Sequence, residues 1–301
     1  MKLQTFDQEE MILRTMNDGA LVSLERALLV LSGLTTEDGV RSYEQKIDEI
    51  YSRFRKECNA RGIPDQSEPP LYLHRSIAEC LFDYLWLSKP KRFGESFLLA
   101  DVIDAQLDPN VNRLVGTCVG LTSLYSVLGL RAGLNLSLLV ASAHLLSRLH
   151  VGQECIDIDH TDPQGFDCHT DEGFKEYSLV VLTANVLNSR GLWNESNGRF
   201  PEARADYRKA ILVNPEYSNA YNNRGNMRLK DGDVEGGIKD YSEALRLNPD
   251  FCEAYCNRGI ARQRLGRFRE ARLDFHMALS ANPEYSDART CMQLLDDIEH
   301  N

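Results

Sequence analysis

The first third of the chain has the hydrophobic pattern of amphipathic helices. Apolar side chains recur at intervals of three or four residues in Ala20–Leu34 and, after an acidic turn, in Ser42–Cys58. This spacing places the apolar side chains on one face of a helix. After the loop Gly62–Pro70 the same period returns in Leu73–Trp86 and in Ser96–Leu107. This region is therefore predicted to be mainly helical.

The pattern changes after Cys118. Val119–Arg131 keeps the helical spacing, and three short apolar stretches follow it: Leu134–Ser142, His144–Val151 and Glu154–Asp159. Stretches of this length joined by short connections are typical of hairpins. We therefore predict an α+β N-terminal domain over residues 1–172, in which helices accompany a small antiparallel sheet.

The second half of the chain repeats itself at intervals of 34 residues. Small residues let two helices pack closely, an aromatic ring fills the space beside them, and one helix pair cannot bury its apolar face alone. We therefore predict an all-α solenoid of three helix pairs over residues 184–285 and a capping helix, all within a second domain of residues 173–301. Five columns carry the repeat: Gly191, Gly225 and Gly259; Pro215, Pro249 and Pro283; Tyr207, Tyr241 and Phe275; Ala210, Ala244 and Ala278; Ala203, Gly237 and Ala271.

These columns resemble the tetratricopeptide repeat (TPR). The resemblance implies a concave groove for a peptide or a partner protein, lined by the first helix of each pair. Asn188 stands where the carboxylate-clamp version of the repeat has a lysine, so the sequence does not predict recognition of a free C-terminus. The candidate groove residues are Asn188, Asn222, Asn226, Arg228 and Arg262.

A second set of arginines leaves two interpretations open. Arg190, Arg224 and Arg258 keep the 34-residue interval. They either line the groove or cover the helix pair with their aliphatic stems.

The distribution of charge excludes some partners. The net charge is −11, and residues 1–180 hold 27 acidic against 17 basic residues. An acidic surface repels phosphate groups, so we expect neither nucleic acid nor an anionic membrane as a partner. The start of the chain, Met1–Asp18, is acidic where a signal peptide is basic. We therefore expect a cytoplasmic protein with its eight cysteines reduced.

Cys118, His144 and Asp159 form a candidate nucleophilic site. Cys118 lies at the predicted start of a helix, where backbone N–H groups favour a thiolate and can hold an oxyanion. His144 begins a predicted strand and Asp159 ends another, so an imidazole base and the carboxylate that orients it can meet on neighbouring strands. Asp157 is the weaker candidate for the carboxylate.

The stretch from Gly116 to Leu134, with Ser142-Ala143-His144 and Cys155–Thr161 after it, resembles the transglutaminase-like superfamily of papain-type folds. More narrowly it is similar to the Sir-B-type bacterial branch, in which such a domain often precedes TPR repeats. The resemblance implies a triad of Cys118, His144 and Asp159 for acyl transfer, by amide hydrolysis or amide exchange.

Two hypotheses on function remain open from the sequence. The first is a thiol enzyme whose repeats recruit a protein substrate, and the second is a non-catalytic adaptor or regulator that binds proteins. No metal or other cofactor is predicted, because Cys155, His160, Cys168 and His169 match no common zinc spacing. The sequence indicates no oligomeric state.

Overall fold

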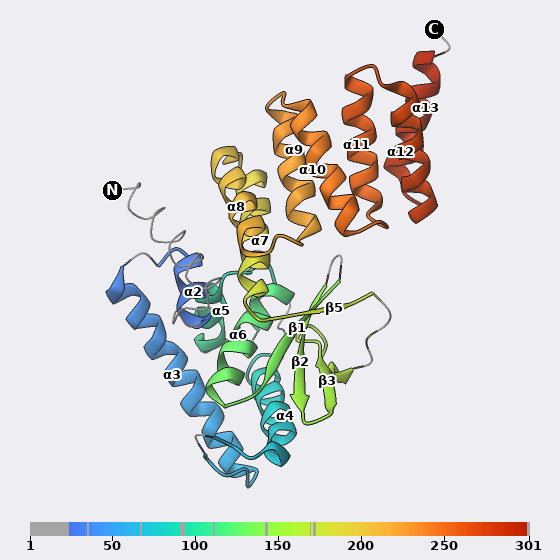
Figure 1. Ribbon diagram of the computed structural model, residues 1–301. Helices are drawn as coiled ribbons and strands as arrows, with labels where there is room; N and C mark the ends of the chain where they lie inside the picture. Colours follow the sequence, from blue (N-terminus) through green and yellow to red (C-terminus); the bar gives the residue numbers. More distant parts are fainter. Residues whose placement is uncertain are drawn as a thin grey trace. The chain divides into compact units, whose positions relative to one another are not determined.

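The computed structural model describes residues 24–34, 36–66, 68–90, 94–110, 112–141, 144–168, 170 and 173–299 (Figure 1). The chain forms two compact units, Met1–Ser189 and Arg190–Asn301. No helix within the described residues has both the length and the apolar character needed to cross a lipid bilayer.

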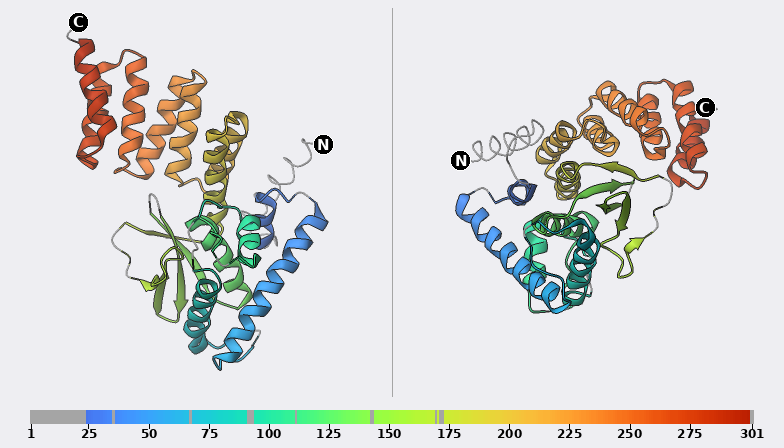
Figure 2. Two further views of the ribbon diagram at one scale, coloured as in Figure 1. Left: turned by 180° about the vertical axis from the view of Figure 1, so that it is seen from behind. Right: turned by 60° about the horizontal axis from the view of Figure 1, so that its bottom comes forward.

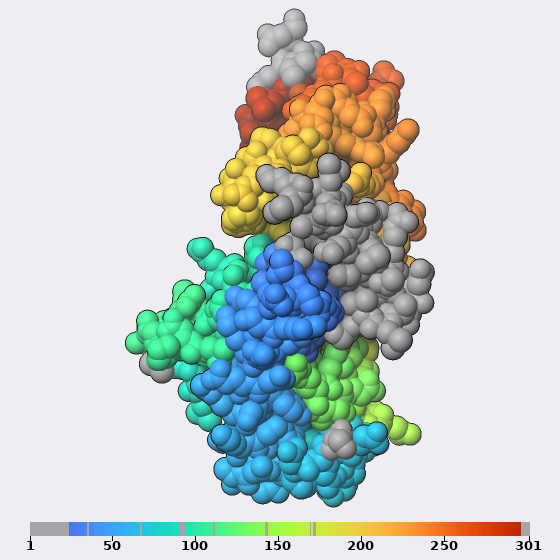
Figure 3. Space-filling view, turned by 90° about the vertical axis from the view of Figure 1, so that its left-hand side faces the viewer, coloured from blue at the N-terminus to red at the C-terminus, as the bar shows by residue number. Residues whose placement is uncertain are grey.

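Unit 1 contains the helices predicted from the periodicity. α3 is longer than predicted because Thr36 caps it, with the Thr36 hydroxyl accepting a hydrogen bond from Gly39 N at 3.1 Å. Figure 3 shows α3 at the surface of the unit. Residues 20–23, at the start of the first predicted helix, lie outside the described residues. The helices are α2 (Leu24–Leu31), α3 (Glu37–Ala60), α4 (Leu71–Ser88), α5 (Leu99–Leu107) and α6 (Cys118–Arg131).

A small antiparallel sheet completes unit 1, as predicted. Its strand order is β4-β3-β2-β1-β5, and α4 and α6 pack against β2 on one face (Figure 2). The side chains of Leu138, Leu149 and Ile158 on this side are fully buried. The sequence pattern missed β4 and β5, because three residues are too few to show an alternation. The strands are β1 (Leu136–Val140), β2 (Leu145–Val151), β3 (Glu154–Ile158), β4 (Phe166–Cys168) and β5 (Lys175–Tyr177).

Unit 2 is all helical, which confirms the predicted repeat architecture of the C-terminal region. The helix α7 crosses the division between the units, and the helices after it stack in sequence order (Figure 1). They are α7 (Val181–Ser196), α8 (Phe200–Val213), α9 (Ser218–Lys230), α10 (Val234–Leu247), α11 (Cys252–Arg264), α12 (Phe268–Ala281) and α13 (Ser286–Glu299).

A glycine facing an aromatic ring joins the two helices of each repeat. The rings of Tyr207, Tyr241 and Phe275 are fully buried. A Cβ atom added at Gly225 would lie 2.7 Å from Cε1 of Tyr241, and the corresponding distance is 2.5 Å at Gly191 and at Gly259. Real Cβ atoms do not come so close, so the ring occupies the space that the missing side chain leaves.

The Asn-Pro pairs end the second helix of each repeat. α8, α10 and α12 each stop one residue before an asparagine in extended conformation, at Asn214, Asn248 and Asn282. The residue before a proline is sterically kept out of the helical region. Each asparagine Oδ1 also accepts a hydrogen bond from the backbone N–H two residues later, which forms an Asx turn.

We predict opposite effects for two alanine substitutions in the second repeat. Alanine adds about 1 kcal/mol of helix propensity over glycine, but in Gly225→Ala it overlaps a buried ring that cannot move. Gly225→Ala should therefore lower the free energy of unfolding by about 1–3 kcal/mol, as overpacking does.

Gly237→Ala is the matched control, because its Cβ would meet no atom closer than 3.3 Å. It should be neutral or stabilising. Urea unfolding followed by circular dichroism measures both effects. Equal midpoints for the two variants would show that the ring does not limit the helix approach.

Candidate functional site

Cys118 is the first residue of α6, as the sequence predicts. Thr117 is the N-cap, and its hydroxyl accepts from the backbone N–H of Gly120 at 3.4 Å. The Thr117 N–H in turn donates to the carbonyl oxygen of Ser96 at 2.7 Å. The thiol therefore lies at a helix N-terminus that is tied to the segment before α5, and its residue is half-buried.

Two glycines on either side of Cys118 allow this close packing. A Cβ at Gly116 or at Gly120 would lie 2.6 Å from the Ser96 carbonyl oxygen and less than 3.0 Å from the Val102 side chain. Any other residue at these positions would push the Ser96 backbone away from the start of α6. This role was not predicted, although the Gly-x-Cys-x-Gly spacing is visible in the sequence.

His144 and Asp159 come together at the ends of adjacent strands. His144 immediately precedes β2 and Asp159 immediately follows β3, and Ser147 is paired with Ile158 in the antiparallel register. The Nε2 atom of His144 lies 2.8 Å from Oδ2 of Asp159. Residues 142–143, the predicted turn before His144, lie outside the described residues.

The electrostatics of the pair favour a charged imidazole. Hydrogen bonds to Asp159 and then to Cys118 raise the pKa of His144 to about 10 from an ordinary 6.5, against the effect of burial. Burial raises the pKa of Asp159, but the hydrogen bonds from His144 and Thr161 outweigh it and lower that pKa to about 2.

Thr161 and Gly165 hold Asp159 in place. The backbone N–H and the hydroxyl of Thr161 both donate to Oδ1, at 2.8 and 2.6 Å, which leaves Oδ2 for His144. The Asp159 N–H donates to the Gly165 carbonyl at 2.8 Å. A Cβ at Gly165 would lie 2.8 Å from the Cβ of Asp159. The role of Gly165 was not predicted from the sequence.

The weaker candidate Asp157 has a different partner. Both of its carboxylate oxygens accept from the Arg148 guanidinium, at 2.7 and 2.9 Å, and Thr170 donates to it at 2.7 Å. His160 also has other partners. Its Nε2 lies 2.8 Å from the Ser147 hydroxyl, and its ring packs on Tyr125. Asp159 is therefore the carboxylate that reaches His144.

Two of the candidate groove asparagines, Asn222 and Asn226, make contacts between and within repeats. Asn222 donates to Glu253 and accepts from Asn257, both at 3.0 Å, so it joins α9 to α11. Asn226 accepts from the Tyr241 hydroxyl at 2.8 Å. Asn188 is a buried residue of α7.

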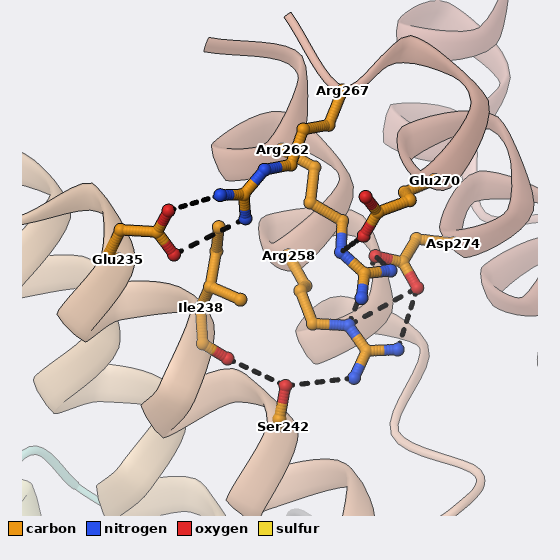
Figure 4. A network of polar contacts seen from close by, with 8 residues as sticks. All are labelled: Glu235, Ile238, Ser242, Arg258, Arg262, Arg267, Glu270 and Asp274. Carbon is orange, nitrogen blue, oxygen red and sulfur yellow. Dashed lines mark hydrogen bonds and ion pairs between the residues drawn. The ribbon is translucent and has the colours of Figure 1, made fainter. Parts of the chain in front are cut away.

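The candidate groove arginines, Arg228 and Arg262, contact the same buried aspartates as Arg224 and Arg258 do. Asp274 accepts from Arg258 and from Arg262, and the shortest distance to each is 2.8 and 2.7 Å (Figure 4). Asp240 lies 2.7 Å from Arg224 and 3.3 Å from Arg228.

In the first repeat Asp206 pairs with Arg190 at 2.6 Å and with Asn194 at 2.8 Å. Each of the three aspartates has a side chain at most 5% exposed. Arg190, Arg224 and Arg258 therefore tie the two helices of each repeat together. Arg228 and Arg262 contribute to the same pairs.

The comparisons with known proteins concern unit 2. A family model described as TPR repeat matches residues 196–232 and 225–266, so the C-terminal region contains TPR repeats. No curated protein matches the chain.

Solved TPR domains also align with part of the chain. The Arabidopsis OM64 TPR domain is 25% identical and covers 39% of this chain and 98% of its own, with a TM-score of 0.38. The first TPR domain of human RPAP3 is 25% identical over 39% of this chain and 92% of its own, with a TM-score of 0.38. The first TPR of Spaghetti (RPAP3), solved with an HSP90 peptide, is 24% identical over 40% and 94%, with a TM-score of 0.38.

We predict that Asp159→Asn lowers the pKa of His144 from about 10 toward 6.5, because it removes the largest cause of the shift. A raised histidine pKa stabilises the fold at low pH. The contribution is complete below about pH 6.5 and is lost as the pH rises through about 10. Titration of the imidazole signals by NMR measures the pKa directly.

Asp162→Asn is the matched control, since Asp162 lies in the same loop and accepts from Gln164 N instead. The His144 pKa should not change in this variant. Equal titration midpoints for Asp159→Asn and the unmodified chain would contradict the assigned contact.

Proposed function

We propose that the chain is a transglutaminase-like thiol protein that catalyses acyl transfer on a protein or peptide, by amide hydrolysis or amide exchange. In this proposal residues 1–172 form the catalytic domain, and the repeats within residues 173–301 recruit the substrate or partner. The observation that carries it is the position of His144, whose Nε2 lies 2.8 Å from Oδ2 of Asp159 and whose pKa is raised to about 10 by Asp159 and, second, by Cys118.

In the proposed chemistry Cys118 attacks as the thiolate, and Asp159 stabilises the charge on His144. The Cys118 sulfur attacks the carbonyl carbon of an amide, and the oxyanion that forms faces the N–H groups at the start of α6. An α-helix leaves its first N–H groups without partners inside the helix. His144 then gives its proton to the leaving amine, and an acyl thioester on Cys118 remains.

The second half of the reaction restores the thiol. Water or an acceptor amine attacks the thioester carbonyl carbon, and His144 removes the proton from this nucleophile. The Cys118 sulfur leaves as the thiolate beside the imidazolium. Water as the acceptor gives hydrolysis, and an amine gives exchange. Asp159 orients the ring and stabilises its charge in both steps.

The TPR repeats support a role in protein interaction. Stacked helical repeats form extended concave surfaces that bind other chains, and the TPR model matches residues 196–266 of this chain in two segments. We infer a protein or peptide partner for the groove predicted from Asn188, Asn222, Asn226, Arg228 and Arg262. Arg228 and Arg262 pair with buried aspartates, whereas Asn226 accepts a hydrogen bond from the neutral Tyr241 hydroxyl. Asn226 is therefore the more informative position to change in a binding assay, because its substitution removes no charge from a buried ion pair.

The second candidate function is a non-catalytic adaptor or regulator. The observation that favours it is that the matching family model covers the repeats and not the residues around Cys118. An adaptor should bind its partner equally well with and without the substitution Cys118→Ala. For the enzyme, the same substitution should abolish turnover while binding through the repeats persists.

We predict that iodoacetamide alkylates Cys118 faster than Cys252 and Cys291, which are also half-buried. An unperturbed thiol is only a few per cent thiolate at neutral pH. His144→Ala should therefore slow alkylation of Cys118 by about tenfold. Peptide mapping by mass spectrometry gives the rate at each thiol.

The control is His276→Ala, which removes an exposed histidine in unit 2. It should leave all three rates unchanged. If Cys118 reacts no faster than Cys291 and His144→Ala has no effect, the proposed enzyme activity is wrong and the adaptor hypothesis stands.

A further inference from the structure

A second cysteine–histidine–carboxylate group lies on the sheet of unit 1, away from Cys118. It draws one residue from each of four strands: Ser137 of β1, His150 of β2, Cys155 of β3 and Glu176 of β5. His150 and Cys155 are directly paired in the register of the β2–β3 hairpin. The acyl-transfer proposal does not use any of these residues.

The contacts form a continuous chain from the thiol to the carboxylate. The Cys155 sulfur lies 3.5 Å from Nδ1 of His150. On the other side of the ring, Nε2 lies 2.9 Å from Oε1 of Glu176 and 2.9 Å from the Ser137 hydroxyl. Arg148 holds the second oxygen of Glu176 at 3.1 Å. The imidazole is therefore fixed on both sides.

The hydrogen bonds determine which ring nitrogen carries the proton. The Ser137 hydroxyl donates its only proton to Glu176 at 2.6 Å, so toward His150 it can only accept. A hydrogen bond from Ser137 is the largest cause that lowers the pKa of Glu176, and this carboxylate is an acceptor as well. Nε2 must therefore carry a proton, and in the neutral ring Nδ1 presents its lone pair to the Cys155 thiol.

Cys155 is also accessible, unlike most of the cysteines in this chain. It is exposed, whereas Cys58, Cys80 and Cys256 are buried and the other four are half-buried. An exposed thiol beside a positioned base is the setting in which cysteines react with small electrophiles. A small disulfide needs neither a built pocket nor a cofactor to react with such a thiol.

We propose that Cys155 is a second reactive thiol, which forms a mixed disulfide with low-molecular-weight disulfides, and that His150 is its base. His150 Nδ1 takes the thiol proton, and the Cys155 sulfur attacks one sulfur of the disulfide. The new bond joins Cys155 to that sulfur as the original sulfur–sulfur bond breaks. The released thiolate takes the proton from His150, so the small disulfide is the oxidant and one small thiol is the product.

The experiment uses the full chain with Cys118→Ala, so that the result does not depend on the acyl-transfer site. Glutathione disulfide is the probe, and peptide mapping by mass spectrometry measures the adduct at each cysteine over time. Because an unperturbed thiol is only a few per cent thiolate at neutral pH, Cys155 should react about tenfold faster than Cys168 and Cys291.

Variants of the cluster separate base assistance from simple exposure. His150→Ala should slow adduct formation at Cys155 by about tenfold, and Glu176→Gln should slow it by less. His276→Ala, the matched control in unit 2, should not change the rate. Circular dichroism of each variant confirms that the sheet is retained.

Two outcomes would overturn the proposal. In the first, Cys155 reacts at the same rate with and without His150, so that exposure alone accounts for its reactivity. In the second, Cys155 reacts no faster than Cys168 and Cys291. If His150→Ala misfolds, His150→Gln takes its place. Glutamine is polar but cannot act as a base, so this variant should show the same loss of rate at Cys155.

Discussion

In both units, neighbouring atoms approach glycine residues more closely than a residue with a Cβ atom would permit. In unit 1 the Ser96 carbonyl oxygen lies only 2.6 Å from the position that a Cβ of Gly116 or Gly120 would take, and this approach fixes the start of α6 and with it Cys118. In unit 2 the rings of Tyr207, Tyr241 and Phe275 fill the space beside Gly191, Gly225 and Gly259. Dispersion attraction and the burial of apolar surface stabilise such contacts, because protein interiors are close-packed.

Ion pairs between arginine and aspartate recur in each repeat, as the glycine–aromatic contacts do. Asp206, Asp240 and Asp274 are buried, and each accepts hydrogen bonds from the arginine sixteen residues earlier. A buried carboxylate without such a partner would be costly, so the arginine and the aspartate must occur together. The recurrence of Arg190, Arg224 and Arg258 at 34-residue intervals thus has a structural cause.

Cys118, His144 and Asp159 could be proposed from the sequence, because each lies at the end of an element that the hydrophobic pattern could place. The sequence did not indicate the residues that hold them. Close packing at Gly116, Gly120 and Gly165 is possible because glycine has no Cβ atom. Thr161 holds Asp159 by hydrogen bonds within the loop. Nor did the sequence relate the column of aspartates to the column of arginines, because that pairing joins two different helices.

The sequence by itself determined the approximate positions of the helices and of β1, β2 and β3, the 34-residue repeat and the all-helical C-terminal region. These features are local or periodic, so neighbouring residues carry the information. Only the tertiary structure decided that Asp159 and not Asp157 contacts His144, and that Arg228 and Arg262 share buried aspartates. It also brought Cys155, His150, Ser137 and Glu176 together from four strands. Such contacts depend on strand order and side-chain direction, which the alternation along a single strand cannot specify.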